Sequence, residues 1–117
     1  MLAAVVAARA AIGEGDPEAA KALKFAVVCS AALPNPYRPL LERLREKAAA
    51  SSSSILPTLH TLSKVDKMNP SDLGKELAEC FGTGDGGTAS VLWHSAGHEM
   101  PPQDMLNEVA AWLDAQV

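Results

Sequence analysis

The sequence predicts one α/β domain in which three parallel strands are flanked by helices. Three short apolar runs, at 24–29, 55–60 and 90–93, alternate with longer segments of helical periodicity. Strands that alternate with helices at this spacing imply right-handed crossovers and a parallel sheet covered by helices. The chain has 117 residues, of which 48% are hydrophobic and 21% charged, so it fits one globular domain at most.

The first half of the chain is expected to form a helix, a strand and a second helix. Residues 1–12 form an alanine-rich helix with no capping residue before it, and glycines end it. The run 24–29 is apolar throughout, which is typical of a strand buried on both faces. After a loop at 30–39, residues 37–50 repeat apolar side chains with helical spacing. The larger apolar residues of the two helices are Leu2, Val5, Val6 and Ile12, and then Tyr37, Leu40, Leu41, Leu44 and Ala48.

The second half is expected to contain two further pairs of strand and helix. A serine linker at 51–54 leads to a strand within 55–60, and a loop fills 61–70. Ser71 can cap the next helix, and a glycine-rich turn follows at 82–87. The third strand at 90–93 and a loop at 94–102 precede the last helix. The apolar residues of these two helices are Leu73, Leu77, Cys80 and Phe81, and then Met105, Val109, Trp112 and Leu113.

Charge and cysteine content restrict the class of protein. The net charge of −4 and the scattered basic residues argue against nucleic-acid binding, which needs a clustered basic face. The apolar run after Met1 has no basic residue before it and is shorter than the roughly 20 residues of a membrane span. Cys29 and Cys80 match no metal or redox spacing, so we expect buried free thiols in a reducing compartment. These features predict a cytoplasmic protein.

Two residues with catalytic chemistry follow the second and third predicted strands. Asp66 lies in the loop after the second strand, and His98 lies in the loop after the third. The carboxyl ends of parallel strands meet at one edge of a sheet, so we expect the two side chains within or near hydrogen-bonding reach. An acid that precedes a histidine matches the chain order Ser, Asp, His of one class of triad, in which the acid orients the imidazole.

Several stretches carry a resemblance to a known family. Residues 56–60 read Leu-Pro-Thr-Leu-His, and residues 63–70 read Ser-Lys-Val-Asp-Lys-Met-Asn-Pro. Residues 91–101 read Val-Leu-Trp-His-Ser-Ala-Gly-His-Glu-Met-Pro, in which His-x-x-Gly-His-x-x-Pro is the most specific part. With the run 24–30, they resemble the FSH-type family of serine hydrolases over nearly the whole chain. The resemblance implies that the chain is the C-terminal part of an α/β-hydrolase domain.

The resemblance also implies roles for particular residues. Asp66 matches the triad acid and His98 the triad histidine of an esterase or acyl hydrolase, which acts on a small-molecule substrate without a cofactor. The nucleophile motif Gly-x-Ser-x-Gly is absent from the sequence, and residues 1–12 resemble the helix that follows it. The chain departs from the family pattern at Ser63, where the family has glycine, at Asn69, where it has valine, and at Ala31, where it has glycine.

Three other residues are weaker functional candidates. Ser95 follows a strand in a partial nucleophile motif, but Trp93 is too large for the strained turn that such a serine needs. His94 and His98 have the spacing of helical metal ligands, but nearby glycine and proline favour a loop and no third ligand is evident. His60, at a strand end, is interpreted as a packed structural histidine. No metal site is expected.

Two functions remain open from the sequence. The chain is either the C-terminal part of a serine hydrolase, or a truncated, non-catalytic remnant that acts as an interaction module or has no function. In the family, the strand at 24–29 pairs with a strand that this chain lacks. Its unpaired edge therefore predicts self-association of the isolated chain.

Overall fold

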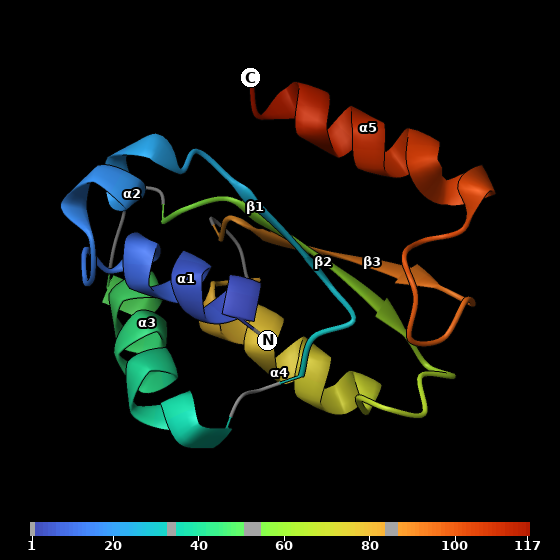
Figure 1. The fold of residues 1–117 in the computed structure, drawn as a ribbon, viewed down its shortest axis with the longest axis horizontal. Coiled ribbons are helices and arrows are strands. Elements are labelled where there is room, and N and C mark those ends of the chain that lie inside the picture. The colour runs from blue at the N-terminus through green and yellow to red at the C-terminus, as the bar shows by residue number, and fades with distance from the viewer. Residues whose placement is uncertain (1, 33–34, 51–54, 84–86) are drawn as a thin grey trace.

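Three parallel strands form the centre of the fold. The computed structural model describes residues 2–32, 35–50, 55–83 and 87–117. Strands β1 (Ala26–Cys29), β2 (Thr58–Ser63) and β3 (Ala89–His94) lie in the order β1-β2-β3, with β2 in the middle (Figure 1). Val28 pairs with His60, and His60 pairs with Val91. The prediction of a parallel α/β fold with flanking helices is confirmed.

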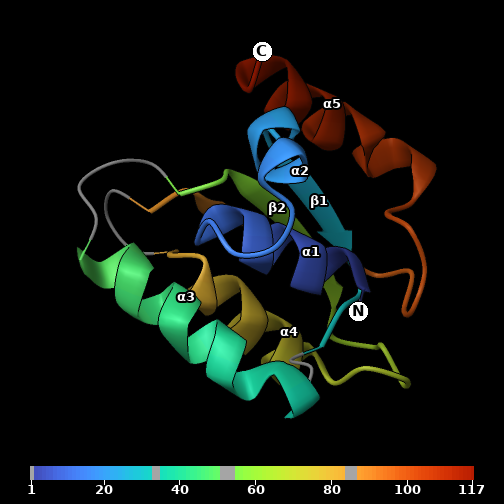
Figure 2. The ribbon, with the colours of Figure 1, turned by 60° about the vertical axis from the view of Figure 1, so that its left-hand side comes forward.

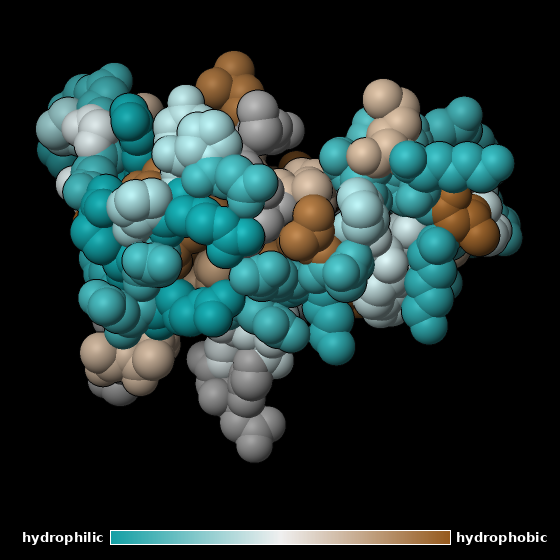
Figure 3. All heavy atoms as spheres, turned by 90° about the horizontal axis from the view of Figure 1, so that it is seen from below, coloured by the Kyte–Doolittle hydropathy of each residue, from teal (hydrophilic) through white to brown (hydrophobic). Residues whose placement is uncertain are grey.

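The helices cover the two faces of the sheet unequally. Helices α1 (Leu2–Ala11), α3 (Arg38–Ala50) and α4 (Ser71–Cys80) lie on one face, and α5 (Leu106–Ala115) lies alone on the other (Figures 1 and 2). Seen from the side of α3 and α4, the molecule is mostly hydrophilic (Figure 3). An ion pair of 3.7 Å between Arg38 and Glu76 joins these two helices at their surface.

The hydrophobic core lies between the sheet and the three helices on its crowded face. Small residues of α1 allow this helix to lie close to its neighbours, whereas Leu2 and Val6 are 76% and 45% exposed. Of the larger apolar residues named for this helix, Val5 is buried together with the alanines, and Leu2 and Val6 face outward. The buried side chains of this cluster include Ala4, Val5, Ala8, Val28, Leu40, Leu41, Leu44, Leu77, Cys80 and Phe81.

The other face of the sheet is packed more loosely. Helix α5 has no fully buried residue. An edge-to-face contact holds it near the start of β1, where the ring centroids of Phe25 and Trp112 lie 5.9 Å apart at an interplanar angle of 85°. A 3₁₀ turn over Gln103–Met105 precedes the helix.

Helix α2 (Pro17–Ala22) was not predicted from the sequence. Asp16 caps it, since its Oδ1 accepts a hydrogen bond of 3.1 Å from the backbone N–H of Glu18. Pro17 occupies the first helical position, where its missing N–H costs nothing. An aspartate followed by proline was the available signal, but the six-residue segment is too short to show an apolar period.

Strand β2 lies three residues later than expected. The sequence predicted a strand within 55–60 and a loop from Thr61, but pairing runs from Thr58 to Ser63. Pro57 has no N–H to donate, so the strand begins after it. All six residues of β2 are buried, including the three that carry hydroxyl groups. The consequence is that β2 ends immediately before the loop that carries Asp66.

Three smaller expectations are also corrected. Ser71 is the first residue of α4 and does not cap it, since Pro70 is the capping position and makes no side-chain hydrogen bond. Tyr37 lies in a 3₁₀ turn and is exposed. Both cysteines are free thiols. Cys80 is buried, and Cys29 is only partly buried.

Some of the segments expected from the sequence lie outside the described residues. These are the serine linker at 51–54, and parts of the loop at 30–39 and of the turn at 82–87.

Candidate active site

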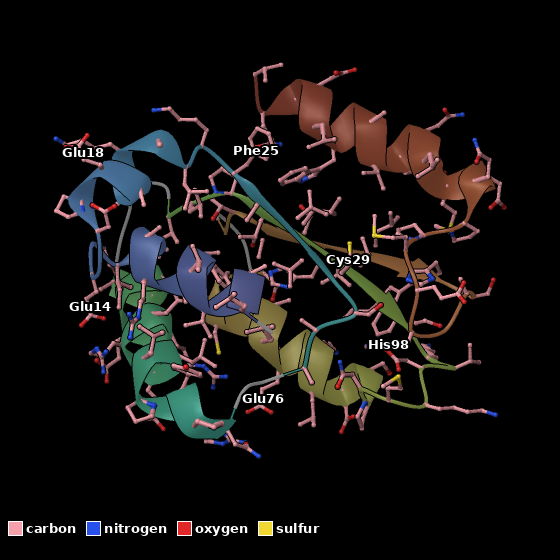
Figure 4. All side chains as sticks on the ribbon, viewed as in Figure 1. Glu14, Glu18, Phe25, Cys29, Glu76 and His98 are labelled. Carbon is pink, nitrogen blue, oxygen red and sulfur yellow. The ribbon has the colours of Figure 1, made fainter. Side chains whose placement is uncertain are left out.

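Asp66 and His98 meet at the carboxyl edge of the sheet. The Nδ1 atom of His98 lies 3.0 Å from Oδ2 of Asp66. The Asp66 side chain is 3% exposed, whereas the His98 side chain is 36% exposed. Figure 4 shows that His98 lies near one end of the sheet. Strand β1 finishes with Cys29 toward this same end. The structure therefore brings together the two residues that the sequence selected.

The loop between β2 and α4 folds around the Asp66 carboxylate. Its Oδ1 atom accepts hydrogen bonds from the backbone N–H of Met68 at 2.8 Å and of Asn69 at 2.9 Å. Its Oδ2 atom faces His98. Oδ1 therefore stabilises the conformation of the loop, and Oδ2 interacts with the imidazole of His98.

The surroundings of Asp66 favour its ionised form. Burial alone would raise the pKa of this carboxyl, but hydrogen bonds from the Asn69 N–H, from His98 and from the Met68 N–H outweigh it. Together with the charge of the imidazole, they hold the pKa of Asp66 below its ordinary value. The carboxylate is therefore charged at neutral pH.

An ionised Asp66 fixes the tautomer of His98. A carboxylate can only accept hydrogen bonds, so Nδ1 of the imidazole must carry the proton that faces Oδ2. In the neutral ring, the lone pair is then on Nε2. This is the form that can take a proton from a hydroxyl group.

Three residues near this pair were not identified as functional from the sequence. Ser63 accepts hydrogen bonds from backbone groups on both sides of the site. Ser30, directly after β1, bonds to the Glu99 carbonyl group, and Asn69 donates to the Ser30 carbonyl group. Ser63 and Asn69 are positions at which the chain departs from the family pattern. Apart from the bond between Ser63 and the nearby Val65 N–H, no local sequence signal predicts these bonds, because the partners are 34 to 69 residues away.

The other histidines have structural surroundings. His60 is buried, contacts the Thr58 hydroxyl group at 3.0 Å and stacks at a tilt on Phe81. Burial lowers the pKa of His60 to about 4, so its ring is neutral at pH 7. His94 is buried, and its Nδ1 accepts a hydrogen bond from the Ala96 N–H. Over the described ranges, no three His, Cys, Asp or Glu side chains are placed to hold a metal ion.

A shallow cleft lies beside the loop that carries Asp66, but Asp66 does not line it. It has a volume of about 580 Å³ and includes Ser95, which is exposed. The Nζ atom of Lys64 lies 5.5 Å from the centroid of the Trp93 ring at this cleft. The remaining lining residues are Val65, His94 and Met105. Among the described residues, no hydrogen bond joins Ser95 to Asp66 or His98.

Comparison with known proteins agrees with the resemblance seen in the sequence. A family model described as "Serine hydrolase (FSH1)" matches residues 1–109, which is nearly the whole chain. No curated protein and no solved structure matches the chain. In the described residues, no helix has the length and apolar character needed to cross a membrane. The family match supports a hydrolase function in general, and the chain belongs to the FSH1 serine hydrolase family.

Proposed function

We propose that Asp66 and His98 are the acid and the base of a Ser-His-Asp triad that hydrolyses esters or similar acyl compounds. One observation carries this proposal. A buried carboxylate, held by two backbone N–H groups, lies 3.0 Å from the imidazole of a partly exposed histidine. This is the arrangement that orients a general base toward a nucleophile.

The proposed chemistry proceeds in two halves. His98 Nε2 removes the proton from a serine hydroxyl group while the serine oxygen attacks the carbonyl carbon of the substrate. Asp66 stabilises the imidazolium that forms, and the imidazolium then donates its proton to the leaving alcohol. Water, activated in the same way by Nε2, hydrolyses the acyl-enzyme and regenerates the serine. Proton and charge thus return to their starting positions.

The nucleophile of this proposal lies outside residues 1–117. The sequence contains no Gly-x-Ser-x-Gly motif. In the described structure, α1 packs against β1 on the face that also carries α3, a position suited to the helix after a nucleophile. We therefore regard the chain as the C-terminal part of an α/β-hydrolase domain.

The proposal can be tested by measuring the activity of the longer polypeptide encoded by the reading frame that contains Met1. An in-frame Gly-x-Ser-x-Gly shortly before this codon would supply the serine. That polypeptide should hydrolyse a p-nitrophenyl ester, and Asp66→Asn should lower kcat by about 10⁴-fold, as expected for a triad acid. His98→Ala should have an effect at least as large. An upstream stop codon without the motif would instead favour the non-catalytic remnant.

The isolated chain provides a complementary measurement. We expect no hydrolysis and no labelling by a fluorophosphonate probe, since neither an activated serine nor its oxyanion donors are supplied. Labelling that disappears in Ser95→Ala but persists in Ser30→Gly would show that Ser95 is a nucleophile. That result would contradict the assignment of the serine to another segment.

We also propose that the isolated chain self-associates through the outer edge of β1. Within the described residues, β1 pairs with β2 alone, and exposed Leu2 and Val6 lie on the neighbouring helix α1. An unpaired edge beside apolar side chains favours association. Sedimentation velocity should show dimers or larger species, which Val6→Lys should reduce and Leu106→Lys, on the other face, should not. A clean monomer of the unmodified chain would refute this proposal.

The free thiols support a reducing compartment for this protein. Neither Cys29 nor Cys80 forms a disulfide in the structure. Cytosolic proteins keep their cysteines reduced. We therefore propose a cytoplasmic location, which localisation of a tagged full-length protein would test.

A further inference from the structure

Two serine residues each contact both loops of the candidate site. We call residues 64–70 the acid loop and residues 95–101 the histidine loop. Ser63, the last residue of β2, accepts hydrogen bonds through Oγ from the N–H of Val65 at 3.3 Å and of Gly97 at 3.1 Å. One hydroxyl group therefore joins the start of the acid loop to the residue directly before His98.

The second serine makes the corresponding connection on the other side. The Ser30 hydroxyl group donates to the carbonyl oxygen of Glu99 at 3.2 Å, and the Ser30 carbonyl oxygen accepts from Nδ2 of Asn69 at 2.7 Å. The Ser30 N–H donates to the carbonyl group of Thr61 in β2 at 2.9 Å, which fixes Ser30 to the sheet. Ser30 thus joins the end of the acid loop to the residue directly after His98.

These bonds bracket both members of the pair. Val65 and Asn69 lie on either side of Asp66 in the acid loop, and Gly97 and Glu99 flank His98. We propose that Ser63, Ser30 and Asn69 are positioning residues that hold the two loops in register, so that Oδ2 of Asp66 and Nδ1 of His98 stay within hydrogen-bonding distance. The proposal takes its catalytic meaning from the proposed function, but its geometry can be tested without activity.

The backbone of Ser30 indicates that this connection is specific. Ser30 has a φ of 51° and is the only residue other than glycine with a positive φ in the described part of the chain. Side-chain-bearing residues adopt this left-handed conformation at an energetic cost, so it persists where the surroundings determine it. Here the N–H, the carbonyl group and the hydroxyl group of one buried residue are all bonded.

Asn69 has a defined donor role. Its partner is a carbonyl oxygen, which can only accept, so the amide nitrogen must face Ser30. Through this bond the end of the acid loop is attached to Ser30, the residue directly after β1.

The test uses the isolated chain and two nuclear magnetic resonance measurements. The first is the pKa of the Asp66 carboxyl, followed by its ¹³C shift. The second is the exchange with water of the proton on Nδ1 of His98. Ser63→Ala and Asn69→Val should raise the Asp66 pKa toward its ordinary value and should speed the exchange about fivefold, the factor expected for one hydrogen bond.

Thr61→Val is the matched control for Ser63→Ala. Thr61 lies two residues earlier on the same face of β2 and is buried, and its hydroxyl group has no hydrogen-bond partner among the residues that the structure describes. We expect this variant to leave both measurements unchanged even where it alters stability. Ser30→Gly retains the backbone bonds and tolerates the positive φ, so it should speed the exchange of the His98 proton more than it changes the Asp66 pKa.

The outcomes separate this inference from the proposed function. Unchanged measurements in both Ser63→Ala and Asn69→Val, or equal changes in Thr61→Val, would overturn the positioning role. Because Asn69 is only partly buried, Asn69→Val decides the question if Ser63→Ala does not fold. If Asp66→Asn leaves the His98 proton unaffected, the pair itself is absent and the proposed function fails.

Discussion

The two helices that follow the loops of the candidate site lie on opposite faces of the sheet, and they differ in how deeply their side chains are buried. The acid loop leads into α4, whose residues Leu77 and Cys80 are buried in the core. The histidine loop leads through a 3₁₀ turn into α5, which has no fully buried residue. The acid loop therefore leads to a helix with a buried face, and the histidine loop leads to a helix with no buried residue. Hydrogen bonds through Ser63 and Ser30 connect the two loops.

The largest expected difference between the faces is in the cost of losing a leucine. Leu77→Ala on α4 should lower the free energy of unfolding by about 3 to 4 kcal/mol, since the side chain is fully buried. Leu113→Ala on α5 should cost about 1 kcal/mol, because this leucine is only partly buried. Urea unfolding of both variants provides the measurement. Equal losses would show that the faces are equally well packed.

The acid sensitivity of the protein should originate on the crowded face, at His60. Its pKa is lowered to about 4 in the folded protein from 6.5, so between these values only the unfolded chain binds the proton. Stability should therefore fall as the pH decreases from 6.5 to 4, by about 3 kcal/mol in total, and this contribution should not change further below pH 4. Unfolding of His60→Leu across this range should lack the slope. A slope retained in that variant would assign the effect to another group.

Gly74 tests how closely α4 approaches the sheet. A Cβ atom at this position would lie 2.8 Å from the carbonyl oxygen of Ala31 and closer still to a methyl group of Leu62. In an exposed helix, alanine stabilises by about 1 kcal/mol relative to glycine. Here Gly74→Ala should instead destabilise by about 1 to 2 kcal/mol, because the added methyl group overpacks the contact. Thermal unfolding gives the sign, and an increase in Tm would contradict the close approach.

The smallest expected effect concerns the attachment of α5. The edge-to-face contact of Phe25 and Trp112 should contribute a coupling energy of about 1 kcal/mol. A double-mutant cycle with Phe25→Leu and Trp112→Leu would measure it by chemical unfolding. A coupling energy near zero would mean that this contact does not hold the helix, and the contrast between the faces would be larger than described.

The sequence predicted the parts of the fold that depend on pattern. The alternation of apolar and helical segments was enough to predict the parallel sheet. The positions of Asp66 and His98 after adjacent strands were enough to predict that their side chains lie close together. The extent of β2 was missed because Thr61 and Ser63 are polar residues that are common in loops, although strand pairing buries them here. Helix α2 was missed because its signals are confined to its first residues.

The residues that hold the site together could not be predicted in the same way. Ser63 and Asn69 are ordinary polar residues in the sequence, and their role depends on partners from other elements. Ser30, which has the positive φ, likewise bonds to three partners distant along the chain. A pattern along one segment contains no information about such contacts, whereas chemistry at strand ends follows from topology.

The unequal use of the two Asp66 oxygens determines how this residue should be mutated. Oδ1 closes an Asx turn with Met68 and Asn69, so an alanine variant would remove the turn together with the charge. Asparagine keeps an acceptor at Oδ1 but can present an amide N–H to the histidine. The imidazole would then have to accept through Nδ1 and carry its proton on Nε2, where it cannot act as a base. Asp66→Asn therefore changes the tautomer of His98 and keeps the turn. Asp66→Ala would change both, so the two effects could not be told apart.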